Sequence, residues 1–206
     1  MIELLLVIAV IGVLAAIAYP VFIGILERAK ATKDMNNLRQ IGIATQLYLN
    51  DNDGALFSTA TSWMSQLHQT KYLSSWNVFQ SPFDTRPPSE LGDVNTPISY
   101  GINGTANLVG TSVDKISQPT IFILFAPAQA STATVTFQGT ALTGLPGVTV
   151  LQAASAPGGA ALGGTHSSRK KVNALFADLH LENMEWSVFT NTPAGSDPSV
   201  AQRWTP

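Results

Sequence analysis

The chain has 206 residues, a formal net charge of −2 at pH 7 and 12% charged residues, roughly half the usual share for a soluble domain. This sparse, slightly acidic charge gives little support to nucleic-acid binding, which needs a strongly basic face. The chain has no cysteine, which excludes structural disulfides, thiolate metal sites, iron–sulfur clusters and a cysteine nucleophile.

The most informative segment is the uncharged run over residues 4–26, which follows Glu3 and precedes Arg28, Lys30 and Lys33. As a helix, these 23 residues would reach roughly 35 Å, against a hydrocarbon core about 30 Å thick. A cleaved secretory signal fits poorly, because its apolar region is shorter and follows a basic stretch. The run therefore predicts a helix of membrane-spanning length, and a single-pass anchor is its simplest interpretation.

Two residues of this segment go beyond what a simple anchor needs. Glu3 places a carboxylate at the edge of the hydrocarbon, which costs energy unless it meets a cation or water. Pro20 removes one helical hydrogen bond and bends the helix. Both features favour a helix with a second role besides anchoring.

Residues 2–20, IELLLVIAVIGVLAAIAYP, closely resemble the N-terminal segment of type IV pilins and type II secretion pseudopilins. Glu3 matches that family's near-terminal glutamate, Gly12 its mid-helix glycine and Pro20 its helix-kinking proline. The resemblance implies a prepilin that a dedicated peptidase cleaves, that is usually N-methylated, and that polymerises through this helix. The family's mature chain normally starts with Phe-Thr, so we expect this sequence to begin about two residues late.

The resemblance also implies a pairing for Glu3, with the N-terminal amine of an adjacent subunit. Such a pair in a dry core favours correct register more than it adds stability. A helix that is apolar on every side can be buried by identical neighbours in a helical array. The expected partners are therefore further copies of the chain, the prepilin peptidase, the pilus assembly machinery and, before assembly, the membrane.

Residues 27–50 continue as an amphipathic helix that should end at the turn cluster over residues 50–54. Ile43 and Leu47 lie off its main apolar face, so we expect the last turns to be buried on two sides. The face consists of Met35, Leu38, Ile41, Thr45, Tyr48 and Leu49. The acidic residues at 50–54 are a weak calcium candidate, because they lack the spacing and terminal glutamate of an EF-hand.

The remaining chain predicts a β-rich head. A short helix is expected after residue 62, a loop over 85–97 and an irregular tail from residue 190. Strands are expected at residues 98–103, 120–125, 133–137 and 148–151, with a hairpin of 172–177 and 180–184. We therefore predict an α+β fold in which a long N-terminal helix, half protruding and half amphipathic, packs on an antiparallel sheet. The predicted division is an apolar helix at 1–26, its continuation at 27–53 and the head at 54–206.

The C-terminal part of the head moderately resembles a pseudopilin-like subfamily that carries a histidine, a spacer and an Asp-Gly pair. Here His166 precedes Asp178, with Leu179 in place of the glycine, and Ser81-Pro82 stands where the subfamily has Cys-Pro. His166, Asp178 and His180 are weak candidates for a metal site. The alternative is a turn aspartate with two solvated histidines at strand ends.

No motif indicates catalysis, because the sequence lacks GxSxG, HExxH, P-loop and dinucleotide fingerprints. His68 is interpreted as a surface residue of the short helix, and Asn103-Gly104-Thr105 is a formal glycosylation sequon. We expect no enzyme activity and no cofactor. The leading hypothesis is a pilus-like filament subunit that starts as an inner-membrane precursor and ends in an extracellular filament. A type II secretion pseudopilin and a monomeric membrane-anchored binding domain are the alternatives.

Overall fold

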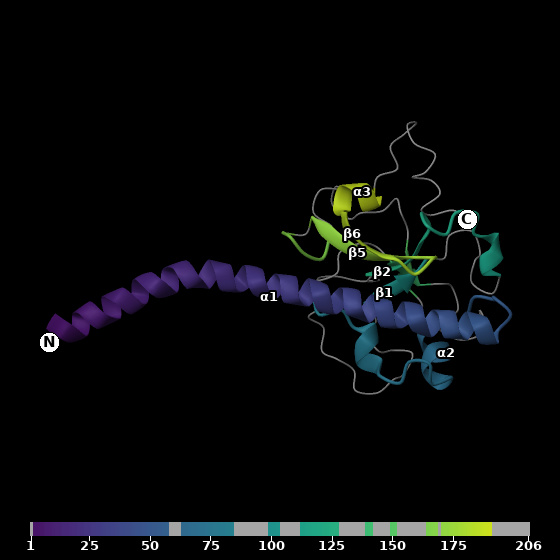
Figure 1. Ribbon diagram of the computed structural model, residues 1–206, viewed down its shortest axis with the longest axis horizontal. Helices are drawn as coiled ribbons and strands as arrows, with labels where there is room; N and C mark the ends of the chain where they lie inside the picture. The colour runs from purple at the N-terminus through teal and green to yellow at the C-terminus, as the bar shows by residue number, and fades with distance from the viewer. Residues whose placement is uncertain are drawn as a thin grey trace.

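The computed structural model describes residues 2–57, 63–84, 99–103, 112–127, 139–141, 149–151, 164–168 and 170–190. A long N-terminal helix protrudes from a folded head (Figure 1). In the head, a sheet and further helices pack around the second half of the long helix. This arrangement confirms the predicted α+β fold. The elements are α1 (Ile2–Asp51), α2 (Trp63–Gln69), η1 (Trp76–Phe79), β1 (Tyr100–Ile102), η3 (Val113–Lys115), β2 (Ile123–Pro127), β3 (Gly139–Ala141), β4 (Thr149–Leu151), β5 (Lys171–Phe176), β6 (Leu181–Glu185) and α3 (Trp186–Thr190).

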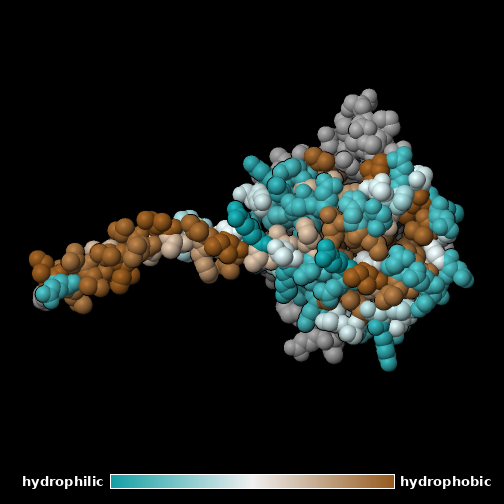
Figure 2. All heavy atoms as spheres, in the orientation of Figure 1, coloured by the Kyte–Doolittle hydropathy of each residue, from teal (hydrophilic) through white to brown (hydrophobic). Residues whose placement is uncertain are grey.

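Helix α1 is a single element that joins the apolar segment to the head. It stays helical through Gly12 and Pro20, and its axis curves in the apolar half (Figure 1), where Pro20 removes one backbone donor. Residues 2–23 are all exposed, and this part projects from the head as an apolar rod (Figure 2). Burial begins at Asp34, so the protruding and packed halves are as predicted.

The packed half of α1 buries one face only. Of the predicted stripe, Met35 is half-buried and the other members are buried. Ile43 and Leu47, in contrast, are 54% and 45% exposed. The expected two-sided burial is therefore wrong for the single subunit, because the described part of the head packs on the opposite side. The helix ends at Asp51, as predicted, and Gly54 closes it by donating its N–H to the Leu49 carbonyl.

The sheet has the strand order β3-β4-β1-β2-β5-β6. Strands β1, β2, β5 and β6 form an antiparallel sheet, as predicted, and β3 pairs antiparallel with β4. The pair of β4 with β1 is parallel, at Ile102 and Val150. Strand β2 starts at Ile123 rather than residue 120, because the chain before it turns: the N–H of Phe122 donates to the carbonyl of Gln118. The strand predicted at 133–137 lies outside the described residues.

The hairpin of β5 and β6 is close to its predicted bounds. The strands pair from Lys171–Glu185 to Leu175–Leu181, and the turn between them holds Leu179 at a φ of 70°. This left-handed region favours glycine, the residue that the resembling subfamily carries there. Leu179 therefore holds a backbone conformation that a side chain with a Cβ rarely adopts.

The sheet separates two apolar clusters. The larger lies between the sheet, α1 and α2, and Trp63 packs there against Phe57, Phe79 and Phe125. The smaller lies on the other face under α3 and includes Trp186. Helix α1 approaches β5 closely at Gly42, where a Cβ atom would lie 3.0 Å from a Leu175 methyl. This approach holds the packed half of α1 against the middle of the sheet.

Candidate functional site

The protruding part of α1 is the first candidate site. Within the described ranges it belongs to the one helix that is long and apolar enough to cross a membrane. Glu3 is exposed and is the only charged residue in positions 1–26. Gly12 has open space where its Cβ would be, so no described part of the head covers the rod there. Such a surface suits burial by lipid or by other copies of the same helix.

The second candidate is a buried carboxylate where α1 meets the head. The Asp34 side chain is fully buried, and it accepts hydrogen bonds from Ser81 Oγ at 2.5 Å, Tyr100 Oη at 2.7 Å and Asn173 Nδ2 at 2.9 Å. Asn37, one turn further along α1, donates to Tyr100 Oη and to the Gln80 carbonyl. One carboxylate thus ties the helix to the loop before β1, to β1 and to β5.

Among the described residues, the side chains that donate to this carboxylate are all uncharged. Burial raises the pKa of Asp34 above its ordinary 3.8, and the three donated hydrogen bonds and the nearby His166 oppose that rise. Burial and the neighbouring carboxylate raise the pKa of Tyr100 well above 10.0, so its hydroxyl remains a donor. Both carboxylate oxygens already accept hydrogen bonds from the protein. Asp34 therefore has a structural role, and no face of the carboxylate is open to a substrate.

The polar network continues from Asp34 to the surface through two amides. Asn173 Nδ2 also donates to the carbonyl of Ala31 at 3.0 Å, which leaves its Oδ1 to accept from Asn183 Nδ2 at 2.7 Å. Asn183 Nδ2 lies 2.6 Å from His166 Nε2. Because a backbone carbonyl can only accept, Ala31 fixes the orientation of Asn173, and Asn173 in turn fixes that of Asn183.

This chain of donors assigns the protonation of His166. Its Nε2 must accept from Asn183, so the proton of the neutral ring sits on Nδ1, 2.9 Å from Thr165 Oγ1. The ring is buried, 5% exposed, and stacks on Phe83. Burial lowers the pKa of His166 below 6.5, while Asp34 and Glu27 oppose that shift and Lys171 adds to it. A second proton on the ring would meet the amide hydrogens of Asn183.

The buried, neutral His166 should make the folded chain less stable in mild acid. Because folding lowers its pKa below the ordinary 6.5, the unfolded chain binds more protons just below that pH, and stability falls as the pH drops through this window. His166→Gln should remove this component of the slope, at most about 1.4 kcal/mol per pH unit for one proton. Urea unfolding of the full chain in detergent, followed by tryptophan fluorescence between pH 7.5 and 5.5, measures it.

The matched control is His68→Gln, since His68 lies on α2, away from the network, with its Nδ1 3.0 Å from the Leu73 carbonyl. This variant should keep the acid-dependent loss. An unchanged slope in His166→Gln would contradict the assignment. The raised pKa of Asp34 acts in the opposite sense, because its stabilising contribution is present below about pH 3.8 and is lost as the pH rises through the folded value.

The three metal candidates do not come together. Asp178 Oδ1 lies 2.5 Å from His180 Nδ1 at the turn of the hairpin, whereas His166 pairs with Lys171 at the other end of β5. A strand of six residues separates these ends by about 17 Å. In the part of the chain that the structure describes, no three His, Asp or Glu side chains form a group that could hold a metal ion. Asp178 is a turn aspartate, as in the predicted alternative. That alternative is wrong for His166, which is buried and not solvated.

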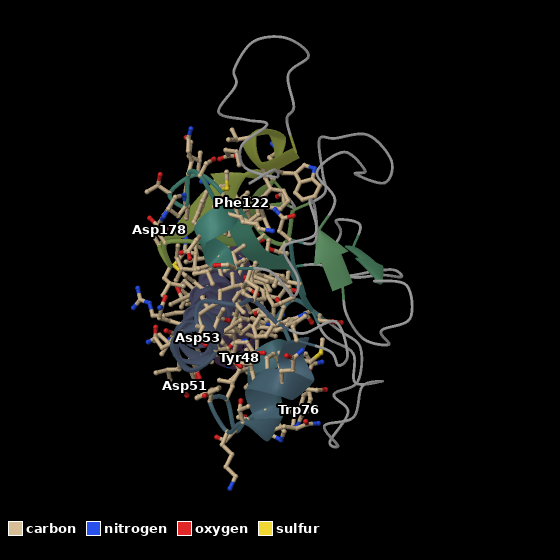
Figure 3. The ribbon with its side chains drawn as sticks, turned by 90° about the vertical axis from the view of Figure 1, so that its right-hand side faces the viewer. Tyr48, Asp51, Asp53, Trp76, Phe122 and Asp178 are labelled. Atoms are coloured by element: carbon tan, nitrogen blue, oxygen red, sulfur yellow. The ribbon has the colours of Figure 1, made fainter. Side chains whose placement is uncertain are left out.

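The weaker candidates for calcium binding, metal binding and glycosylation make structural contacts instead. Asp51 accepts from the Tyr72 hydroxyl at the end of α1, and Figure 3 shows Asp51 and Asp53 well apart from Asp178. The ring of His68 packs on Trp76. Asn103 is fully buried and its Nδ2, the atom that would carry a glycan, donates to the Ile123 carbonyl. The folded head therefore does not present Asn103 for glycosylation.

A cavity of about 580 Å³ lies between the end of α1 and the segment before β2. Its described lining mixes apolar and uncharged polar side chains with Asp114 as its one acid. This lining offers no pairing of a nucleophile with a base. The lining residues are Gln46, Leu49, Asn50, Gly54, Val113, Asp114, Ile116, Pro119 and Ala177.

Comparison with known proteins yields no matching family model, no matching curated protein and no matching solved structure. The function of this chain is therefore inferred from its own residues, from the resemblance of its N-terminal segment and from the geometry of the helix and its junction with the head.

Proposed function

We propose that this chain is a structural subunit that polymerises through residues 2–26 into a type IV pilus-like extracellular filament. The observation that carries the proposal is the long uncharged helix that projects, exposed on every side, from a folded head. In water such a surface is unstable, whereas in lipid it is solvated and helices gain little by meeting each other. The membrane therefore suits storage of the subunit, and a helical array of copies suits its final state.

The resemblance of residues 2–20 supports this reading and supplies the expected steps. The precursor would sit in the inner membrane, a prepilin peptidase would cleave it, and the assembly machinery would extract it. Glu3, Gly12 and Pro20 are the residues assigned to assembly. The proposed role needs neither a cofactor nor a catalytic group.

The buried junction suits the mechanical demand on a filament subunit. When helices form the core and heads the surface, a pull along the filament loads the connection between them. Asp34 and Asn37 fasten α1 to segments that lie far apart in the sequence, at Ser81, Tyr100 and Asn173. The polar contacts fix the helix at one position along the sheet, which apolar packing alone specifies less sharply.

Detergent removal tests the proposal directly. The purified full-length chain, dialysed out of detergent, should form thin filaments of uniform diameter in electron micrographs, and mass spectrometry should find this chain as their subunit. Stable monomers or disordered precipitate would instead favour the anchored binding domain. Filaments sheared from native cells would favour a pilus, whereas filaments seen only on overexpression would favour a pseudopilin.

A further inference from the structure

We propose that Arg28, Lys30 and Lys33 form a basic collar that binds the phosphate groups of anionic phospholipids while α1 spans the membrane. The inference depends on the proposed function only for the membrane-inserted stage. All three side chains are exposed, and none has a hydrogen bond or ion pair within the described part of the chain. The collar is therefore free to pair with an external anion.

The position of the collar along α1 matches the headgroup layer. Taken from Leu26, the last residue of the uncharged run, Arg28 lies about 3 Å, Lys30 about 6 Å and Lys33 about 10 Å further along the helix axis. The polar layer on each side of a bilayer is roughly 5–8 Å thick. Arg28 and Lys30 fall inside it, and the long side chain of Lys33 can bend back to reach it.

The collar also precedes the head, so the head does not shield it. Within the described residues, the first hydrogen bond between α1 and the sheet is at the carbonyl of Ala31, and burial starts at Asp34. Figure 2 shows hydrophilic side chains where the apolar rod enters the head. A lipid headgroup at this level therefore has access to the cations from the sides of the helix that face away from the head.

The angular spread of the charges favours lipid over a one-sided protein partner. At roughly 100° per residue, Arg28 is separated from Lys33 by about 140° and from Lys30 by about 160° around the helix. The acidic Glu27 lies instead in line with Ala31 and Asp34, on the side that faces the head. Its charge acts to raise the pKa of His166. Lys30 lies about 40° from Asp34, so the three cations span about 200° of the helix surface and are not confined to one face. Such a spread matches headgroups, which approach from every side.

The experiment uses the full-length chain reconstituted in vesicles of equal parts phosphatidylcholine and phosphatidylglycerol. After mild detergent extraction, native mass spectrometry counts the lipids that stay bound. We expect phosphatidylglycerol to be retained several-fold over phosphatidylcholine, since each juxtamembrane cation favours anionic lipid by about fivefold. Raising the salt from 0.1 M to 1 M should weaken this preference, as the Debye length falls from about 10 Å to about 3 Å.

Two triple variants make the test specific. Arg28→Gln with Lys30→Gln and Lys33→Gln should abolish the preference. The matched control removes the same charge from exposed positions on the head, Lys71→Gln with Lys115→Gln and Lys170→Gln, and should keep it.

An alkaline carbonate wash of the vesicles measures insertion separately. If the protein resists the wash but both triple variants bind the two lipids as the wild type does, the collar proposal is wrong and the membrane stage stands. If the wild type washes off, the membrane stage and the collar fail together.

Discussion

Replacing Glu3 with alanine is expected to stop filament assembly and to leave the protein inserted in the membrane. Glu3 is the only charge in residues 1–26 and is exposed in the subunit. In a packed array of apolar helices it would be dry, and a dry carboxylate is tolerated only beside a cation such as the N-terminal amine of a neighbour. The pairing therefore stabilises one axial register between neighbouring helices. We expect filament yield, measured in micrographs after detergent removal, to fall by at least tenfold.

Two further variants separate the charge from general damage to the subunit. Glu3→Gln keeps the size of the side chain and should fail like alanine, because it lacks the charge. Glu182→Ala removes an exposed carboxylate from β6 of the head and should assemble normally. A normal filament yield from Glu3→Ala would show that Glu3 is not needed for assembly. Loss of that variant from the membrane fraction would instead indicate a failure of insertion.

The helix and the hairpin could be predicted because their determinants are local. The end of α1 at Asp51 follows from the turn residues 50–54, and the bounds of β5 and β6 follow from short apolar runs flanking Asp178. The pairing of β4 with β1 could not be predicted, because it joins Ile102 to a partner far along the chain through a parallel contact. Strand β3, only Gly139–Ala141, carries too short a pattern to detect.

The assembly residues were accessible to sequence reasoning, whereas the junction was not. Glu3 stands out because it precedes an uncharged run. Asp34 lies in a helix with several other charges, and only its register with Leu38, Ile41 and Thr45 marks it as a polar residue on the buried stripe. Its partners are 47, 66 and 139 residues away in the sequence. Burial of that carboxylate is therefore decided by tertiary structure that no local pattern encodes.

Strand β5 is the reason why His166 does not join Asp178 and His180. His166 and His180 are 14 positions apart in the sequence, and a tight turn between them could in principle bring both rings to one ion. The chain between them instead contains the whole of β5, so the histidines lie at opposite ends of a strand. Spacing alone did not distinguish these outcomes.

Replacing Asp34 with alanine should destabilise the full-length chain by about 3–5 kcal/mol. The change removes the acceptor for Ser81 Oγ, Tyr100 Oη and Asn173 Nδ2 in a region that excludes water, and each buried donor left without a partner costs about 1–3 kcal/mol. The variant no longer has to bury a carboxylate, which is the burial that raises the pKa of Asp34. This gain offsets only part of the cost. Urea unfolding in detergent at pH 7.5, followed by tryptophan fluorescence, measures the difference.

The conservative variant and a surface control give the expected order. Asp34→Asn keeps an oxygen for Ser81 and Tyr100 but turns an NH₂ toward Asn173, so its loss should be about 1–3 kcal/mol. Asp51→Ala, which removes an exposed acid that accepts from one tyrosine, should cost under about 1 kcal/mol. A cost below about 1 kcal/mol for Asp34→Ala would mean that water replaces the carboxylate. In that case apolar packing around Leu38 and Ile41, and not the polar junction, would hold the helix in the head.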